Sequence, residues 1–201
     1  MKRSRVIYWV IGICIAAGVI AAAFYFDQPM RDFLAQHQNR TLKIFMLNVS
    51  RFGDWPEHVA LGLVLLAAAW WRGSKKWLRI FLSMLIALAL AGAAARVLKI
   101  GAGRARPSVQ AGQVWSGPRL SSKFYAFPSG HVAASVGFFA VLLFVRWQIG
   151  IGCMAIPLLI GFARMYVGAH YLSDVICATV LGILCAAIVT HFALRKIDGR
   201  N

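Results

Sequence analysis

Residues 80–95 read IFLSMLIALALAGAAA, a stretch without one charged side chain. Apolar sequence extends outward to about residues 77 and 98, interrupted only by Arg79 near one end and Arg96 near the other. A helix needs about 20 apolar residues to cross ~30 Å of membrane hydrocarbon. This stretch therefore predicts a transmembrane helix.

Five further blocks, at residues 6–26, 57–71, 131–147, 149–165 and 173–194, have the same character. Three of them lie near the lower limit of about 17 residues, so we expect their helices to extend into flanking polar residues. The first block has the basic start of a secretory signal, but its apolar run is too long and no cleavage pattern follows. We therefore expect one domain over residues 1–201, an all-α integral membrane bundle with six transmembrane helices.

The composition agrees with a membrane environment. Hydrophobic residues make up 60% of the chain and charged residues 14%, whereas a soluble domain carries about 25% charged residues. Cys14, Cys153, Cys177 and Cys185 fall inside apolar blocks and lack the paired spacing of a zinc site, so we expect buried, unpaired thiols.

The basic residues predict an orientation. Six helices place both termini on one side, and 11 of the 22 basic residues fall in the tails and short loops of that side, against the single acid Asp198. The positive-inside rule makes this the cytoplasmic face. The net charge of +16 could indicate nucleic-acid binding, but these cations flank membrane helices. We therefore expect anionic lipid headgroups as partners, and no nucleic acid.

The first segment with chemical content follows the third predicted helix, where residues 99–107 read KIGAGRARP. Its glycines allow a close turn and Pro107 prevents a return to helix, so Lys99 and Arg106 are held near one another. An ammonium and a planar guanidinium together suit a phosphate. A basic loop beside a membrane can also simply contact headgroups, which is the role we expect for Arg96 and Arg104.

The second segment reads FPSGH over residues 127–131, directly before the fourth predicted helix. Pro128 and Gly130 favour a tight turn, and the free N–H groups at the helix start form an anion site. His131 can change protonation near neutral pH. Taken alone, it is better explained as a histidine at a helix start without a chemical role.

The third segment reads RMYVGAHYLSD over residues 164–174. His170 and Asp174 are four residues apart, so they share a face of the opening turn of the last helix. We expect Asp174 to accept the Nδ1–H of His170, which leaves Nε2 free as a nucleophile. A surface cap is the alternative, but an ionisable group against a membrane helix is costly and usually functional.

Together the segments read K-x6-RP, PSGH and R-x5-H-x3-D, and this order resembles the type-2 phosphatidic acid phosphatase superfamily, which shares its site with vanadium-dependent haloperoxidases. The resemblance covers Lys99 to Asp174 and, through the helix plan, most of the chain. It implies that His170 attacks phosphorus, that Asp174 orients it, and that His131 protonates the leaving oxygen and then activates water.

The resemblance also implies phosphate-binding residues, namely Lys99, Arg106, Ser129, Gly130 and Arg164. Ala163 stands where the family normally has serine, and the missing hydrogen bond, about 0.5–1.5 kcal/mol, should weaken the site. No acidic cluster suits magnesium, so we expect no metal and no cofactor. Asp54 and Glu57 are expected as loop or cap residues, and His37, His58 and His191 as structural.

These expectations describe a metal-independent phosphatase that hydrolyses a phosphomonoester or diphosphate of a membrane lipid. Isoprenyl diphosphate, phosphatidylglycerol phosphate, phosphatidic acid and a lipid A phosphate are all compatible. A phosphotransferase and a non-catalytic membrane protein are the alternatives. We expect a bacterial inner membrane location with the site on the periplasmic face, where the loop 27–56, with Phe33, Leu34, Phe45 and Leu47 at helical spacing, borders it. The oligomeric state stays open.

Overall fold

The protein is described here by a computed structural model that covers residues 2–109 and 112–198. Within these residues the only β pairing is an isolated bridge between Arg104 and Trp115. The all-α prediction is therefore confirmed. The elements are α1 (Lys2–Tyr25), α2 (Asp27–Gln36), α3 (Arg40–Phe52), α4 (Trp55–Trp71), α5 (Lys75–Ala102), the short 3-10 helix η1 (Ser122–Phe124), α6 (Gly130–Val145), α7 (Trp147–Cys153), α8 (Ala155–Tyr166) and α9 (Leu172–Asp198).

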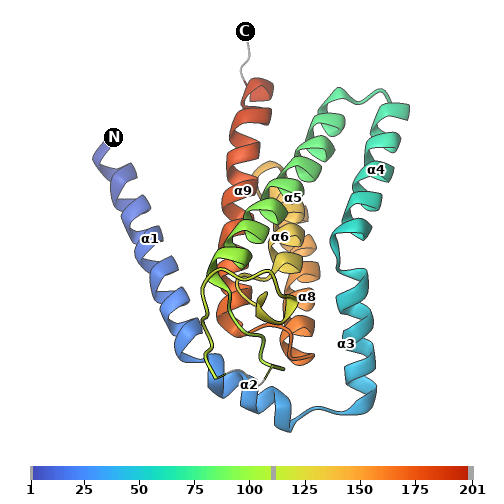
Figure 1. Ribbon diagram of the computed structural model, residues 1–201. Helices are drawn as coiled ribbons and strands as arrows, with labels where there is room; N and C mark the ends of the chain where they lie inside the picture. Colours follow the sequence, from blue (N-terminus) through green and yellow to red (C-terminus); the bar gives the residue numbers. More distant parts are fainter. Residues whose placement is uncertain (1, 110–111, 199–201) are drawn as a thin grey trace.

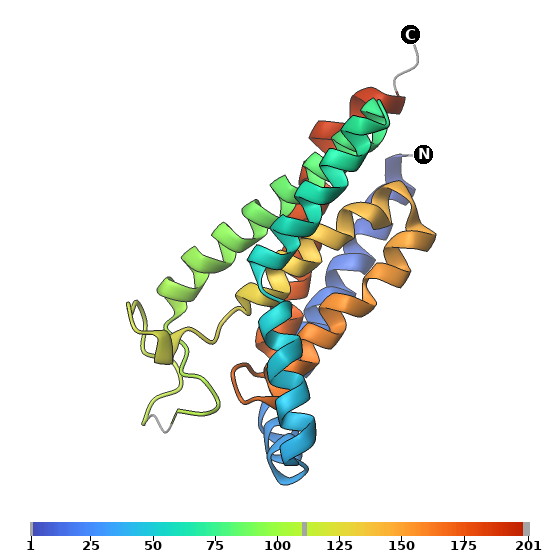
Figure 2. The same cartoon turned by 90° about the vertical axis from the view of Figure 1, so that its right-hand side faces the viewer.

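The helices form an elongated bundle whose two ends differ (Figures 1 and 2). The start of α1 and the end of α9 lie at one end. Helix α2 crosses the opposite end, where the α5–α6 loop and the α8–α9 turn also lie. This arrangement brings the three sequence segments of interest to the same end of the bundle.

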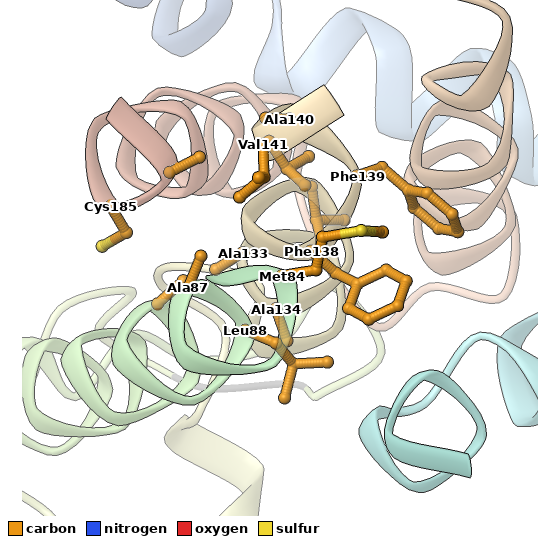
Figure 3. Packing of buried hydrophobic residues seen from close by; sticks show 14 of the residues in the cluster. Met84, Ala87, Leu88, Ala133, Ala134, Phe138, Phe139, Ala140, Val141 and Cys185 are labelled. Atoms are coloured by element: carbon orange, nitrogen blue, oxygen red, sulfur yellow. The ribbon is translucent and has the colours of Figure 1, made fainter. Parts of the chain in front are cut away.

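The core consists of α5, α6 and α9, each of which packs against the other two. Its residues from Val132 to Leu142 are all buried, and Figure 3 shows Phe138 and Ala134 beside Met84 and Leu88 of α5. At Gly137 a Cβ would lie 2.8 Å from the carbonyl oxygen of Ala87. Glycine thus permits the close approach of α5 and α6, as small residues do between membrane helices.

Length and composition identify fewer membrane spans than the six expected. Three helical stretches of the described chain qualify, α5, the α7–α8 stretch from Trp147 to Tyr166, and α9 as far as Ala193. The bent pair α1–α2 makes a fourth if it counts as one span. Helix α4 has 17 residues and α6 has 16, because α4 begins after a break at Asp54 and α6 ends before Arg146. The integral membrane class is supported, and the count of six is not confirmed.

The segment 27–56 is helical, as its apolar spacing predicted, but it forms two helices. Leu34 of α2 and Met46 of α3 pack against Tyr166 of α8, whereas Phe33 and Phe45 are exposed. One face of this segment thus covers protein. The cysteine prediction is correct in part, because all four are unpaired but only Cys185 is buried; Cys14 is exposed and the other two are half-buried.

Candidate active site

The end of α5 positions Lys99 at one side of the site. Gly103 has a φ of +55° and caps α5 in the left-handed conformation, where a Cβ would collide with the carbonyl of Gly117. The chain therefore turns sharply after Lys99, which lies in the last turn of α5. The Lys99 ammonium reaches the start of α6, because a Cβ on Gly130 would lie 3.4 Å from its Nζ.

Ser129 occupies the N-cap position of α6 and is completely buried. Its peptide N–H donates to the carbonyl oxygen of Asp174 at 3.1 Å, which ties the second segment to the third. Its Oγ has no hydrogen-bond partner, and the same holds for the buried Nε atoms of Arg106 and Arg164. Leaving such groups unpaired costs free energy, so these three atoms suit the oxygens of a bound phosphate.

Three cations gather at this end of the bundle. Lys99 is within electrostatic range of Arg106 and Arg164, which also repel one another. Arg164 donates from Nη1 to Ser50 Oγ of α3 at 2.7 Å. Burial lowers the pKa of Arg106, and Asp174 opposes the shift. Concentrated positive charge of this kind attracts an anionic ligand.

Ala163, the position that departs from the family motif, is fully buried. It packs with Leu34 and Met46, so the methyl group belongs to the contact between α8 and the α2–α3 segment. The weaker phosphate binding expected from the missing hydroxyl stays a prediction.

His170 is only 2% exposed and has a fixed orientation. Its Nδ1 lies 2.7 Å from the carbonyl oxygen of Ala126. Since a carbonyl only accepts, Nδ1 carries the proton and Nε2 keeps its lone pair. Burial lowers the pKa of His170 to about 4, with Asp174 opposing the shift. The imidazole is therefore neutral at physiological pH.

The expected hydrogen bond between His170 and Asp174 is not formed. Asp174 Oδ2 lies 3.6 Å from Nδ1, beyond hydrogen-bond distance. The reason is that Asp174 has other donors: Oδ2 accepts the N–H of Tyr171 at 2.7 Å and Oδ1 accepts from Arg104 at 2.5 Å. Asp174 thus acts on His170 through its charge, while Ala126 fixes the tautomer.

His131 has a different environment. Its side chain is 24% exposed, and Nε2 lies 3.3 Å from Oδ1 of Asp54. Asp54 also caps α4 by accepting the N–H of Trp55 at 2.8 Å. The expectation of a cap residue is correct for Asp54, but its contact with His131 was missed, because nothing in the sequence relates two residues on separate helices.

The prediction for Arg104 is wrong. Arg104 does not face lipid headgroups; it is 3% exposed and bonds to two buried carboxylates, Asp27 and Asp174. Its guanidinium lies 4.2 Å from the centre of the Tyr171 ring and 4.7 Å from that of Trp115. Two counter-charges and the aromatic cover make burial of this cation favourable.

A cavity of about 520 Å³ opens beside the site between α4, α5 and α6. Lys99, Gly130 and His131 line one end of it, and exposed Arg96, over the Tyr125 ring, lies near them. The remaining wall is mostly apolar, with Val59, Leu88 and Ala93 among its members. Ser129, His170 and Asp174 are not part of this wall and lie buried within the protein.

An all-α bundle with membrane-spanning helices, which holds two histidines and three cations at one end, has the organisation of a membrane phosphatase. The chain belongs to the PAP2 superfamily, whose sequence profile matches residues 80–198. The resemblance inferred from the three motifs is thereby confirmed. The match begins in α5 and ends in α9, so it leaves out α1 to α4.

Two curated relatives have similar sequences. The chain is 42% identical over 96 residues to a lipid A 1-phosphatase of Rhizobium johnstonii, which covers 45% of this chain and 38% of that protein. A lipid A 1-phosphatase of Rhizobium etli is 41% identical over 96 residues, with 45% and 40% covered. The chain thus spans about two fifths of the length of these relatives.

Two solved structures share the fold. The transmembrane PAP2-type phosphatidylglycerolphosphate phosphatase of Bacillus subtilis superposes with a TM-score of 0.71 at 22% identity, over 96% of this chain and 98% of that one. LpxE of Aquifex aeolicus gives a TM-score of 0.61 at 21% identity, over 83% and 96%. The helical arrangement is therefore that of PAP2 membrane phosphatases.

Among the described residues, no three His, Cys, Asp or Glu side chains gather as a metal site. Metal independence is a statement about the reaction, and it stays a prediction.

Proposed function

We propose that this protein hydrolyses a phosphomonoester or diphosphate of a membrane lipid through a phosphohistidine at His170. One observation carries the proposal: a buried neutral imidazole, with its proton fixed on Nδ1, lies within electrostatic range of Lys99 and Arg164, at the end of the bundle where buried donors are unpaired. A nucleophile needs a free lone pair, and a phosphate needs such donors.

In the first step the Nε2 atom of His170 forms a bond to phosphorus while the bond from phosphorus to the lipid oxygen breaks. His131 gives a proton to that leaving oxygen. Charge on the three equatorial oxygens is stabilised by Lys99, Arg106 and Arg164 and by hydrogen bonds from Ser129 Oγ and the Gly130 N–H.

In the second step His131, now neutral, takes a proton from water as the water oxygen attacks phosphorus. The bond from Nε2 to phosphorus breaks, inorganic phosphate leaves, and both histidines return to their starting protonation states. Asp174 stabilises the positive charge that His170 carries in the intermediate.

The cavity supports a lipid as substrate. Its polar end at Lys99 and His131 suits the phosphate, and the apolar wall from Val59 to Ala93 suits a hydrocarbon chain between α4 and α5. The curated relatives are named for lipid A and one structural relative for phosphatidylglycerolphosphate. These two lipids are the first substrates to test, followed by isoprenyl diphosphate and phosphatidic acid.

The decisive experiment measures free phosphate from each lipid with water as the only acceptor, in excess EDTA. We expect release that EDTA leaves unchanged and that vanadate, a mimic of pentacoordinate phosphorus, inhibits. Release that needs an added lipid or sugar acceptor would identify a phosphotransferase. No release from any of the four lipids, or an absolute need for magnesium, would overturn the proposal.

We also propose six crossings of a bacterial inner membrane, with both termini in the cytoplasm and the site on the periplasmic face. The bundle supports this, because the start of α1 and the end of α9 lie opposite the site end (Figure 1). A cysteine at Ser121, in the α5–α6 loop, should react with an impermeant thiol reagent in intact cells after the four native cysteines are replaced. Labelling only after lysis would reverse the orientation.

A further inference from the structure

A buried ionic cluster lies behind the predicted catalytic pair and joins three distant parts of the chain. Its members are Asp27, at the bend between α1 and α2, Arg104, in the α5–α6 loop, and Ser173 and Asp174, at the start of α9. Each is at most 4% exposed. Asp27 lies outside the residues that match the family profile.

Arg104 connects the two carboxylates. Its Nη1 donates to Asp174 Oδ1 at 2.5 Å and to Ser173 Oγ at 2.7 Å, and its Nη2 donates to Asp27 Oδ2 at 2.6 Å. The planar guanidinium therefore fixes the distance between Asp27 and Asp174.

Asp27 is held as firmly on its other side. Its Oδ1 accepts the Ser173 N–H at 2.8 Å, and its Oδ2 accepts the Ser173 hydroxyl at 2.6 Å. The first of these bonds satisfies the Ser173 N–H in the first turn of α9. A helix usually receives such a bond from the side chain of its own N-cap residue, just before the helix begins. Here the carboxylate comes from the N-terminal part of the chain.

Aromatic rings exclude water from this cluster. Besides Tyr171 and Trp115, the ring of Phe24 lies 5.5 Å from the Arg104 guanidinium. In such surroundings charges interact strongly, and removing one partner leaves another charge uncompensated.

We propose that Arg104 and Asp27 are positioning residues for Asp174, with Arg104 holding the carboxylate and Asp27 holding Arg104. The inference rests on the proposed role of His170 as nucleophile. Its basis is that Asp174 makes no direct hydrogen bond to His170, so the 3.6 Å separation depends on the groups that hold Asp174 from behind. The bend between α1 and α2 thereby becomes part of the catalytic apparatus.

The two substitutions have opposite electrostatic consequences. Arg104→Gln removes a positive charge from Asp174, so the proton affinity of His170 rises. Asp27→Asn removes a negative charge from Arg104, which then neutralises Asp174 more fully, so the affinity falls. The other charged or titratable groups that act on His170 are Lys99, Arg164 and His131, and Arg106 and Cys177 lie within electrostatic range of Asp174. None of them is changed in these variants.

The first measurement needs no turnover. In full-length protein labelled with 15N-histidine, the resonance that is absent from His170→Gln reports the protonation midpoint of His170. We expect a higher midpoint in Arg104→Gln and a lower one in Asp27→Asn, with Asp32→Asn, an exposed acid of α2, unchanged. Midpoints that do not move in Arg104→Gln or Asp27→Asn, in protein with unaltered helix content, would overturn the inference.

The second measurement is a double-mutant cycle on turnover, in detergent micelles, of whichever of the four lipids the wild type hydrolyses fastest. We expect each single variant to lower kcat about 10- to 100-fold, the usual scale for outer partners of a site, with KM nearly constant. Asp27→Asn should add little in the Arg104→Gln background, because it acts through Arg104. Arg104→Lys, which keeps the charge, should recover part of kcat.

The outcomes separate two failures. If wild type releases no phosphate while the midpoints shift as expected, the proposed function fails and the positioning network stands. If wild type is active and the two losses multiply in the double variant, Asp27 acts independently of Arg104 and the inference fails.

Discussion

His131 and His170 lie within electrostatic range of one another, yet they differ in exposure and in hydrogen bonding. His170 is 2% exposed and fixed by the Ala126 carbonyl, with a buried network behind it. His131 lies at the cavity end with a side chain 24% exposed, and Asp54, which contacts it, is itself 40% exposed.

This difference matches the two tasks proposed for them. A histidine nucleophile must be neutral, with one nitrogen lone pair free to attack phosphorus. A group that protonates a leaving oxygen and later activates water must reach both substrate and solvent. The comparison therefore predicts which substitutions are most damaging, and on which substrates.

The largest effect should follow His170→Ala. We expect turnover and any acid-labile phosphoenzyme to disappear together, because no other group in the proposed mechanism can form the covalent bond. Radiolabelled phosphate trapped by an alkaline denaturing quench, in which phosphohistidine is stable, measures this directly. Trapped phosphate in His170→Ala would assign the nucleophile elsewhere.

His131→Ala should be damaging in a manner that depends on the leaving group. On a lipid phosphate we expect kcat/KM to fall about 10²–10⁴-fold, the usual contribution of general acid catalysis. On nitrophenyl phosphate, whose leaving group needs little protonation, the loss should be far smaller. Equal losses of kcat/KM on both substrates would contradict the role of His131 as the group that protonates the leaving oxygen.

Acidification should test the buried setting of His170 next. Since burial lowers the pKa of His170 to about 4, the neutral nucleophile persists as pH falls through 6.5 and is lost only near pH 4. Between these values the unfolded chain binds this proton and the folded protein does not, so stability declines as pH falls. The 15N spectrum at pH 5 should still show His170 with its proton on Nδ1 alone. An imidazolium signal at pH 5 would contradict the buried setting.

The smallest effect should come from Asp54→Asn. Asparagine also caps a helix well, so α4 is kept while the charge beside His131 is removed. Because Asp54 is 40% exposed, we expect kcat/KM on the lipid to fall only several-fold, within the range of exposed charge pairs. The variant should have no further effect in His131→Ala. Comparable losses in both backgrounds would assign Asp54 a role other than its contact with His131.

The sequence was most informative where residues are local or belong to a spaced motif. The motifs predicted that Lys99, Arg106, Ser129, Gly130 and Arg164 lie near the two histidines, and the helical class followed from apolar block lengths. The spans were harder, because α6 is short and enclosed by α5 and α9, and protein cover relaxes the length that lipid demands. The assigned chemical roles remain predictions.

Long-range polar pairing escaped prediction. Arg104 is 77 residues from Asp27 and 70 from Asp174. In the sequence it is one more cation in a basic loop. Only the fold shows that Arg104 bonds to two carboxylates and is surrounded by aromatic rings. The same holds for the Ala126 carbonyl, since a backbone acceptor leaves no trace in the residue type.

The cavity between α4 and α5 has a kinetic consequence. In the proposed topology α4 and α5 border the hydrocarbon, so we expect the substrate's chain to reach Lys99 and His131 without leaving the bilayer. Encounter then takes place in two dimensions, and the velocity follows the mole fraction of substrate among the surrounding lipids. Diluting the same amount of substrate with inert phospholipid should slow the enzyme, whereas diluting the whole vesicle suspension with buffer should not.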